Sequence, residues 1–383
     1  MIYEPKEDSY LIEKHIKNYA KGNVLDVGTG SGILANKAEK FANKVYAIDI
    51  QSEVIKYCKK EYKNKNIIFL KSDLFSALNK EKISFDLIIF NPPYLPNDPK
   101  FEDITLFGGK KGYETIEKFF LNVSKFLKSN GKILLLFSNL TNKEKVDEII
   151  NNYGFSFELI DKEQIFFEIL YVYLIKKTEL LKKLENKKIK KIRYFSKGKR
   201  GIIFQGILNN KKVLIKSKNP NSKATFRIEN ETNIIKKLEK YNIGPKIIDY
   251  TNEYFIYTFN EGIYFLDYII NNSKTKIIKV IKEIFRQLKI LDELKINKEE
   301  MHNPRKHIII GKNITLIDFE RSHFTHKPKN ITQFSEFLCS KTIKEILDKK
   351  NILIDKKKVI KLCTDYKQDK INADKLISYF LKV

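Results

Sequence analysis

Residues 23–32 read NVLDVGTGSG, and this stretch decides the fold of the first half of the chain. Its first five residues are mostly apolar and β-branched, which is typical of a buried strand. Gly28, Gly30 and Gly32 then allow a tight turn, in which the backbone comes close to a ligand and presents N–H groups at the start of a helix. Ile33 stands where a dinucleotide-binding fingerprint, GxGxxG, needs its third glycine. The turn therefore does not match that fingerprint.

Strand and helix patterns alternate along the chain around this turn. Ser52 and Asn142 are expected to cap helices, and Gly131 and Gly154 to end them. Such alternation predicts an α/β domain with a doubly wound, mostly parallel sheet, which binds its ligand at the carboxyl ends of the strands. The expected strands are 23–28, 44–50, 66–70, 85–90 and 132–137, the expected helices 52–62, 113–127 and 142–153, and a closing antiparallel pair 156–161 and 168–175.

Aspartates stand at the ends of the next two strands. The carboxylate of Asp49 can accept both hydroxyls of a ribose, and Asp73 lies beside the position expected for an adenine. A single Asp at a strand end is more often a turn residue. Together with Asp26 they make three aspartates on consecutive strands around a glycine turn, which rarely coincide by chance. They predict a nucleoside-containing cofactor.

Residues 91–94 read NPPY and follow the fourth expected strand. Proline has no N–H, so the two prolines stiffen the loop and leave its carbonyl groups pointing outward. The side-chain oxygen of Asn91 and the carbonyl of Pro92 can accept both hydrogens of a planar NH2 group, and Tyr94 can pack on its flat face. This arrangement predicts chemistry at an amide or amino nitrogen, carried by positioning and polarisation without a metal.

Four stretches together resemble the HemK/PrmC family of S-adenosylmethionine-dependent methyltransferases, and more closely its archaeal–eukaryotic branch of protein-glutamine methyltransferases. They are 3–10 (YEPKEDSY), 26–32 (DVGTGSG, similar to motif I of class I methyltransferases), 85–96 (FDLIIFNPPYLP) and 108–112 (GGKKG). The resemblance covers residues 1–177. It implies N5-methylation of the glutamine in the GGQ motif of a class I translation termination factor, with a small zinc-binding activator protein as a partner.

The resemblance also implies roles for single residues. Asn91, Pro92 and Tyr94 would form the catalytic loop that grips the acceptor. The residues expected to bind the cofactor are Glu7, Asp8, Asp26, Gly28, Gly30, Gly32, Asp49, Asp73 and Asn91. The same NPPY is similar to that of adenine-N6 methyltransferases, because an exocyclic NH2 and an amide NH2 present similar geometry. Methylation of RNA or DNA, with base flipping from a duplex, therefore stays open.

Positive charge is concentrated in the second half of the chain. The 383 residues carry a formal net charge of +26. Residues 1–177 hold 27 Lys, no Arg and 24 acidic residues, whereas 178–383 hold 46 basic and 23 acidic residues. Because clustered Lys and Arg neutralise phosphates, the second half is a candidate module for binding RNA or the ribosome. The near-neutral first half argues against a dedicated nucleic-acid enzyme.

The composition fits the cytoplasm. Cys58, Cys339 and Cys363 are scattered and form no CxxC pair, which suits a reducing compartment without a disulfide framework. No apolar run approaches the ~20 residues needed to cross a bilayer, and residues 1–10 are acidic rather than a signal-peptide core. A membrane is therefore not expected among the partners.

The composition changes after residue 177. Residues 182–200 carry ten basic residues against one acidic residue, a pattern of either a solvated linker helix or a strip that faces nucleic acid. The expected organisation is a methyltransferase domain at 1–177, a basic linker at 178–196, a further domain at 197–345 and a Lys-rich helical tail at 346–383.

The region 197–345 resembles an α+β protein-kinase-like fold, close to archaeal RIO and other small atypical kinases. A hairpin is expected over 197–216 with an Asn209-Asn210 turn, followed by a helix over 225–238 that contains Arg227. A strand is expected over 314–317. The glycines Gly198, Gly201 and Gly206 depart from the kinase GxGxxG spacing.

The kinase resemblance implies an ATP site with Mg²⁺. Lys216 would neutralise phosphate charge, Glu231 would pair with it, and Asp318 would hold the metal ion. By register, His302 and His307 stand at the positions of the catalytic Asp and of the Mg²⁺-binding Asn. Histidine can act as a base near neutral pH, but it is a poorer Mg²⁺ ligand than a carboxylate or amide oxygen. Phosphoryl transfer, nucleotide binding without transfer, and a basic binding module all stay open for this region.

Overall fold

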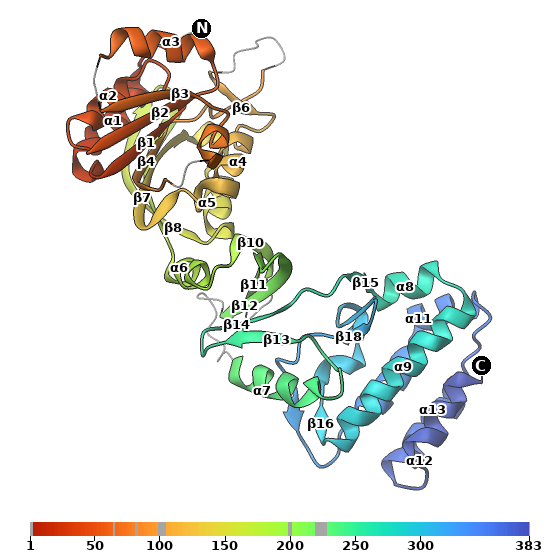
Figure 1. Cartoon of the computed structure of the whole chain (residues 1–383). Coiled ribbons are helices and arrows are strands. Elements are labelled where there is room, and N and C mark those ends of the chain that lie inside the picture. The colour runs from red at the N-terminus through yellow and green to blue at the C-terminus, as the bar shows by residue number, and fades with distance from the viewer. Residues whose placement is uncertain are drawn as a thin grey trace. The chain divides into compact units, whose positions relative to one another are not determined.

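The computed structural model describes residues 3–63, 66–80, 83–98, 105–197, 201–218 and 228–382. The chain divides into two compact units, one made of Met1–Tyr194 and Gln205–Lys211, the other of Phe195–Phe204 and Lys212–Val383 (Figure 1). Within the described ranges, no helix is both long enough and apolar enough to cross a membrane.

A seven-stranded sheet in the order β3-β2-β1-β4-β7-β9-β8 forms the centre of the first unit. Strands β1, β2, β3, β4 and β7 run parallel, and β9 is antiparallel to both β7 and β8. The predicted mostly parallel sheet and its closing antiparallel pair are therefore confirmed. The strands are β1 (Asn23–Val27), β2 (Lys44–Asp49), β3 (Ile67–Lys71), β4 (Phe85–Phe90), β7 (Leu127–Ser138), β8 (Phe155–Ile165) and β9 (Glu168–Lys177).

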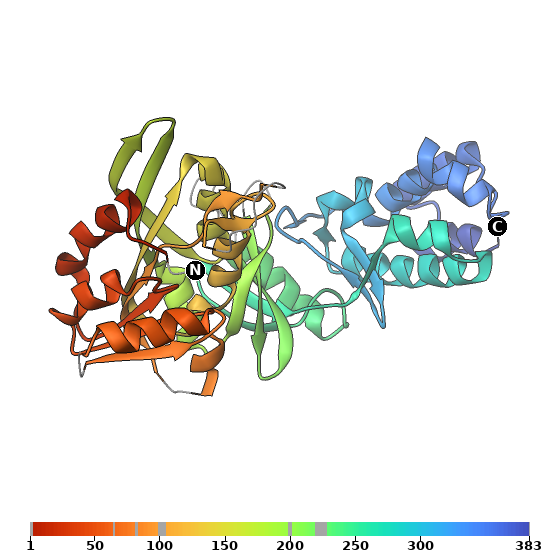
Figure 2. The same ribbon diagram turned by 90° about the horizontal axis from the view of Figure 1, so that it is seen from above.

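Helices cover both faces of this sheet (Figures 1 and 2). One face packs against α1 (Glu7–Tyr19), α2 (Ile33–Glu39) and α3 (Ser52–Glu61), and the other against α4 (Glu114–Val123) and α5 (Lys143–Asn152). Side chains alternate along β4, since successive residues of a strand point to opposite faces. Leu87 and Ile89 join the first core, and Ile88 and Phe90 join the second.

Some element ends differ from the sequence prediction. Ser52 is the first residue of α3, and Gln51 precedes it as an N-cap without a side-chain hydrogen bond, so the predicted cap is wrong by one residue. Asn142 caps α5 through its side chain, as predicted. Helix α4 ends at Val123, and Gly131 lies inside β7 instead of ending a helix. A Cβ at Gly131 would come within 2.8 Å of a β4 carbonyl oxygen, so close strand packing explains this glycine.

A second, five-stranded sheet has the order β10-β11-β12-β14-β13. The predicted hairpin joins β11 to β12. Its turn residues Asn209 and Asn210 have φ of 48° and 61°, a left-handed conformation that Asn tolerates. The basic stretch after α6 (Glu179–Asn186) becomes strand β10, so a single linker helix through residue 200 does not form. The strands are β10 (Lys190–Lys197), β11 (Gly201–Leu208), β12 (Lys211–Lys218), β13 (Ile247–Tyr250) and β14 (Tyr254–Thr258).

Helices and short strands make up the rest of the second unit. Helix α7 (Ile228–Glu239) matches the predicted helix, while Gly198 and Arg227 lie outside the described residues. Strand β18 (Ile314–Leu316) precedes Asp318. The remaining helices are α8 (Phe265–Asn271), α9 (Lys274–Glu293), α10 (Asn330–Leu338), α11 (Lys341–Asp348), α12 (Lys356–Lys367) and α13 (Ala373–Leu381).

The C-terminal helices pack on the second unit. The ring of Phe380 in α13 lies 5.0 Å from that of Phe285 in α9, and Lys289 pairs with Asp374 at 2.8 Å.

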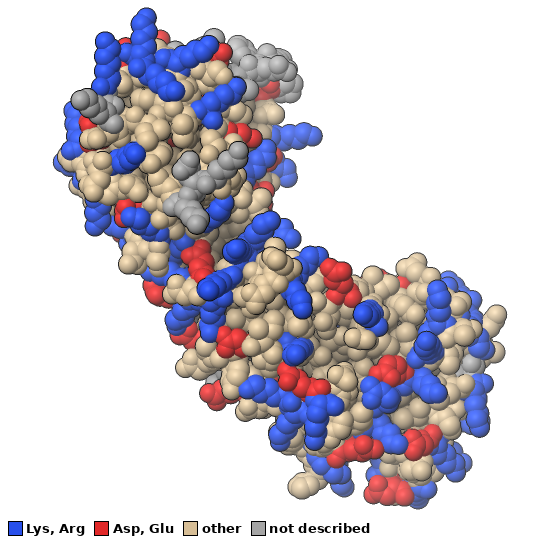
Figure 3. Space-filling model, in the orientation of Figure 1, with Lys and Arg blue, Asp and Glu red and all other residues tan. Residues whose placement is uncertain are grey.

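On the face that Figure 3 shows, Lys and Arg side chains are spread widely with acidic side chains among them. The positive charge on this face is therefore dispersed and does not form one continuous patch.

Candidate functional site

The turn between β1 and α2 is built from glycines in the left-handed conformation. Gly28, Gly30 and Gly32 have φ of 68°, 53° and 83°, values that glycine adopts without steric cost. A Cβ added at Gly28 would meet no atom within 4 Å, so this residue borders open space. A Cβ at Gly32 would come within 2.6 Å of the Tyr62 ring. Gly28 therefore leaves room for a ligand, whereas Gly32 is needed for packing.

Asp49 and Asp26 lie at different depths beneath this turn. Asp49 accepts hydrogen bonds from the N–H groups of Gly30 (3.1 Å) and Gln51 (2.9 Å), and burial raises its pKa. A carboxylate has about four lone-pair sites, so these bonds and one from the Ile50 N–H leave acceptor capacity for a ligand hydroxyl. Asp26 is only 1% exposed and accepts from the Thr29 hydroxyl at 2.6 Å, and burial raises its pKa to about 7. Asp26 thus lies behind the turn.

A cavity of about 390 Å³ opens at the carboxyl ends of the parallel strands. Glu7 is exposed on the first turn of α1, and Glu7, Asp26 and Gly32 are not among the residues that line the cavity. The structure brings most of the residues predicted for the methyltransferase site together around the cavity: Asp8, Gly28, Gly30, Asp49, Asp73, Asn91, Pro92 and Tyr94.

Several lining residues were missed by the sequence reasoning. Tyr3 lies in the YEPKEDSY segment, and its hydroxyl donates to Asp8 at 2.9 Å. The segment between the NPPY loop and α4 contributes a further wall. Its lining residues are Thr105, Leu106 and Phe107, and the first turns of α4 add Thr115 and Lys118. Nothing in the local sequence pattern marks these five residues as cavity-lining.

Asp8 fixes the orientation of the Asn91 side chain. Asn91 Nδ2 donates to Asp8 Oδ2 at 2.9 Å. A carboxylate only accepts hydrogen bonds from an amide, so the NH2 end of Asn91 must face Asp8. Asn91 Oδ1 is buried and has no hydrogen-bond partner in the described structure. A buried carbonyl oxygen without a partner is costly, which makes this atom the natural acceptor for a ligand N–H.

Two glycines allow a neighbouring segment to pack closely against the backbone of the NPPY loop. Strands β5 (Leu95–Pro96) and β6 (Phe107–Gly109) pair beside it. A Cβ at Gly108 would come within 2.4 Å of the Pro93 carbonyl oxygen, and one at Gly112 within 2.4 Å of that of Tyr94. The Tyr94 carbonyl also accepts from the Thr141 hydroxyl at 2.9 Å. The glycines of the GGKKG stretch are therefore needed for close packing against the NPPY loop. The sequence alone did not predict this role.

The cavity fits the nucleoside cofactor that the sequence predicts. Open space at Gly28 leaves room for a ligand against the backbone. Asp49 offers oxygen acceptors for ribose hydroxyls, and Asp73 lines the same cavity at the end of the next strand. Asp8 adds a carboxylate near Asn91, where an ammonium group of an amino-acid moiety could bind.

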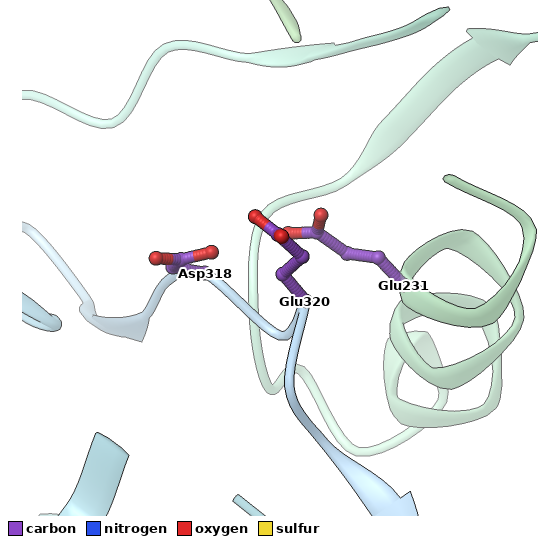
Figure 4. Close-up of side chains that lie close together, drawn as sticks. All are labelled: Glu231, Asp318 and Glu320. Atoms are coloured by element: carbon purple, nitrogen blue, oxygen red, sulfur yellow. The ribbon is translucent and has the colours of Figure 1, made fainter. Parts of the chain in front are cut away.

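A second polar cluster lies in the other unit, around Lys216 on β12. Its ammonium nitrogen lies 2.7 Å from Glu231 of α7, 2.9 Å from Asp318 and 3.5 Å from Glu320. Figure 4 shows the three carboxylates, with Asp318 and Glu320 on one segment and Glu231 reaching in from α7. Burial acts to lower the pKa of Lys216, but Glu231 and Asp318 outweigh it and raise this pKa.

Asp318 has the features of a strained, charged site residue. Its φ of 62° is uncommon for a residue with a side chain. Burial acts to raise its pKa, but Lys216 and Lys298 outweigh that effect and lower it to about 2. The three carboxylates offer oxygens within 4.8 Å of one another, and carboxylate oxygen is a ligand that suits Mg²⁺. The ammonium of Lys216 lies among the same three groups.

The two histidines of this region are placed differently. His307 lies 3.7 Å from Asp318 Oδ2, too far for a hydrogen bond, and its pKa is lowered by burial and then by Lys298. His302 is exposed, and its Nδ1 lies 2.5 Å from the Glu299 carbonyl oxygen of its own turn. The contacts recorded for the described residues thus join His307, and not His302, to the Lys216 cluster.

The first unit is similar in sequence to known methyltransferases. Residues 6–167 match the family model "Methyltransferase small domain". A putative protein N5-glutamine methyltransferase of Methanocaldococcus jannaschii is 35% identical over 179 residues, which are 45% of this chain and 89% of that relative. A release factor glutamine methyltransferase of Buchnera aphidicola is 33% identical over 169 residues, 39% of this chain and 60% of that relative.

The solved E. cuniculi Mtq2-Trm112 complex, which is responsible for methylation of the eRF1 translation termination factor, aligns with 25% identity. Its TM-score is 0.39 over 46% of this chain and 99% of that chain. Sequence identity to the M. jannaschii relative, spanning nearly all of that protein, establishes the family. The chain belongs to the methyltransferase small domain family, and its first unit is an S-adenosylmethionine-dependent methyltransferase.

Proposed function

We propose that the first unit methylates the side-chain amide nitrogen of the glutamine in the GGQ motif of a class I translation termination factor. The names of two relatives, a protein N5-glutamine and a release factor glutamine methyltransferase, support this acceptor. The observation that carries the proposal is the orientation of Asn91, whose NH2 group is held by Asp8 while its buried oxygen lacks a partner. A primary amide supplies the matching N–H.

The loop acts by holding the acceptor amide in place. Bound S-adenosylmethionine supplies an electrophilic methyl group on a positively charged sulfur. Asn91 Oδ1 and the Pro92 carbonyl accept the two amide hydrogens, which draws electron density toward the nitrogen and directs its lone pair into the cavity. Tyr94 packs against the flat face of the amide. Burial raises the pKa of the Tyr94 hydroxyl, so it stays neutral there.

The acceptor test is transfer of a labelled methyl group to a GGQ-containing termination factor. The matched control is the same factor with that glutamine changed to alanine, and both are measured with and without a small zinc-binding activator protein. Labelling that depends on the glutamine supports the proposal, and an increase with the activator supports that partner. No labelling, with cofactor binding confirmed, would favour the exocyclic amino group of adenine in RNA or DNA.

We propose the cytoplasm as the compartment of this activity. The three cysteines are free, buried thiols, and a reducing compartment keeps thiols in that state. Translation termination factors act in the same compartment, so the proposed acceptor and the cysteine chemistry agree.

For the second unit we propose nucleotide binding at Lys216, on an atypical kinase-like fold. Lys216 would neutralise phosphate charge, Glu231 would hold its side chain, and Asp318 would bind Mg²⁺, with Glu320 as a neighbouring oxygen ligand. The ion pairs of Lys216 with Glu231 and Asp318 support this reading. The exposed position of His302 gives no support to phosphoryl transfer, so binding alone is proposed.

Calorimetry of the full chain with ATP, with and without Mg²⁺, tests this site. Lys216→Ala is expected to abolish binding, while Lys212→Ala, an exposed lysine four residues earlier on β12, is expected to leave it unchanged. An RNA-binding module would respond differently, because its affinity would fall steeply with salt. Absence of ATP binding together with salt-sensitive RNA binding would replace the nucleotide proposal.

A further inference from the structure

The two-residue turn between β8 and β9 carries the most exposed large apolar side chains in the described part of the chain. Phe166 is 90% exposed and Phe167 is 98% exposed. Turns of this length normally use Gly, Asn or Asp, whose backbone tolerates positive φ. Phe166 has a φ of 53°, a conformation that is strained for a bulky side chain. Folding alone would favour a smaller, polar residue at this position.

This turn lies at the same edge of the sheet as the NPPY loop. Strand β7 ends at that edge, and the first residues of β9 pair with its end, Ser138 with Leu170. The segment that follows β7 ties the two features together. Asn139 Oδ1 accepts from the N–H of Ile169 at 2.8 Å, and the Thr141 hydroxyl donates to the Tyr94 carbonyl at 2.9 Å. The Phe166–Phe167 turn, the segment Asn139–Thr141 and the NPPY loop therefore lie along one edge of the sheet, which we call the rim of the acceptor cavity.

The residue after the turn, Glu168, is partly buried. Glu168 Oε1 is buried and has no hydrogen-bond partner in the described structure. The charge of Glu168 helps to raise the pKa of Tyr94, after burial and the charge of Asp8. It contributes least to the raised pKa of Tyr3, after burial, Asp8 and Glu7, and both tyrosines line the cavity. The carboxylate of Glu168 therefore lies close enough to the cavity for its charge to act on Tyr3 and Tyr94.

We propose that the Phe166–Phe167 turn, with Glu168, is a docking surface for the folded acceptor protein, outside the glutamine that is methylated. The inference rests on the proposed function. A glutamine in a loop of a folded protein can reach Asn91 only if the surface around that loop lies over the rim. Exposed aromatic side chains are the usual anchors of protein interfaces. Leu140, 48% exposed in the segment after β7, extends the same apolar rim.

The test compares intact termination factor with a short peptide that contains GGQ, because only the intact factor presents a folded surface to the turn. The variant is Phe166→Asn with Phe167→Ala, since Asn tolerates the positive φ and both positions are exposed. The matched control is Phe41→Ala, an aromatic residue that is 44% exposed just before β2, at the opposite edge of the sheet. Thermal unfolding confirms that both variants are folded.

We expect the turn variant to raise KM for the intact factor roughly 30-fold, with kcat, cofactor Kd and peptide methylation unchanged. Phe41→Ala should leave all four unchanged. An unchanged KM for the factor, with wild-type protein active, overturns the docking inference alone. Equal losses on peptide and factor also overturn it, because the turn would then act on the catalytic loop. Wild-type protein that labels no glutamine overturns the proposed function and this inference with it.

Other occupants of the turn would give different results. If the wild-type chain is a dimer in light scattering and the turn variant is a monomer, a second copy of the chain covers the turn. If the wild-type chain binds phosphatidylcholine vesicles and the variant does not, the turn inserts into lipid. Either result overturns the assignment to the acceptor protein.

Discussion

Asp8→Ala removes the group that orients Asn91 without touching Asn91 itself. In the folded protein Asp8 accepts from Asn91 Nδ2 and from the Tyr3 hydroxyl, both at 2.9 Å. Without the carboxylate, Asn91 loses the hydrogen bond that holds its oxygen toward the acceptor, and its side chain can leave this rotamer or present its NH2 group instead. The acceptor amide then meets a donor where it needs an acceptor.

The size of the effect follows from the bond that is lost. A hydrogen bond to a charged group contributes about 1.5–3 kcal/mol, and about 1.4 kcal/mol corresponds to a tenfold change in rate, so kcat is expected to fall roughly 10- to 150-fold. Asp8→Asn keeps one carbonyl oxygen for Asn91 and should lose less. Tyr3→Phe removes the other donor to Asp8 and leaves the Asn91 bond in place, so it should lose least.

A double-mutant cycle decides whether Asp8 acts through Asn91. Single-turnover methyl transfer is measured at saturating cofactor and acceptor for Asp8→Ala, Asn91→Ala and the double variant. If Asp8 only positions Asn91, the double variant is no slower than Asn91→Ala alone. If the two losses multiply, Asp8 has an independent role and the positioning argument fails.

Three further outcomes are expected from the first unit. Asn91→Ala should abolish methyl transfer while the Kd for S-adenosylmethionine in calorimetry stays within a few-fold, and loss of cofactor binding in a folded variant would contradict its role. Asp49→Ala should do the reverse, raising that Kd about 10- to 100-fold through lost hydrogen bonds to the carboxylate, and an unchanged Kd would remove Asp49 from the ribose site. Because burial raises the pKa of Asp26 to about 7, its contribution to stability is present below the unfolded-state pKa and is lost as pH rises through about 7. The unfolding free energy of Asp26→Asn should therefore rise relative to that of the wild type by about 1.4 kcal/mol per pH unit between roughly pH 4 and 7. Urea unfolding measures this difference. A difference that does not change with pH would show that Asp26 ionises normally.

Local patterns in the sequence predicted the first sheet and most of the cavity. Alternating apolar runs determine strands and helices over short distances, and the parallel strands bring their carboxyl ends to one edge. Asp49, Asp73 and Asn91 therefore meet although they are far apart in the chain. Errors arose where packing overrides a local signal, as at Gly131, which reads as a helix stop and is a close contact between strands.

The contacts that tune the site could not be predicted from the sequence. Asp8 and Asn91 are 83 residues apart, and no local pattern indicates that one orients the other. Only the family resemblance points to Gly108 and Gly112, because the need for glycine at both positions depends on carbonyl oxygens of another loop. In the second unit, register placed His302 at a catalytic position, whereas the fold leaves it exposed.

Tyr3 lines the cavity although it lies outside the helices and strands, in the segment before α1, and this has a practical consequence. Lys6 is an exposed residue between Tyr3 and α1, and trypsin cleaves after lysine. Cleavage there would detach one wall of the cavity together with a hydrogen-bond donor to Asp8. Limited proteolysis with trypsin can therefore report ligand binding without a label. The rate of cleavage after Lys6 is expected to fall when a ligand fills the cavity.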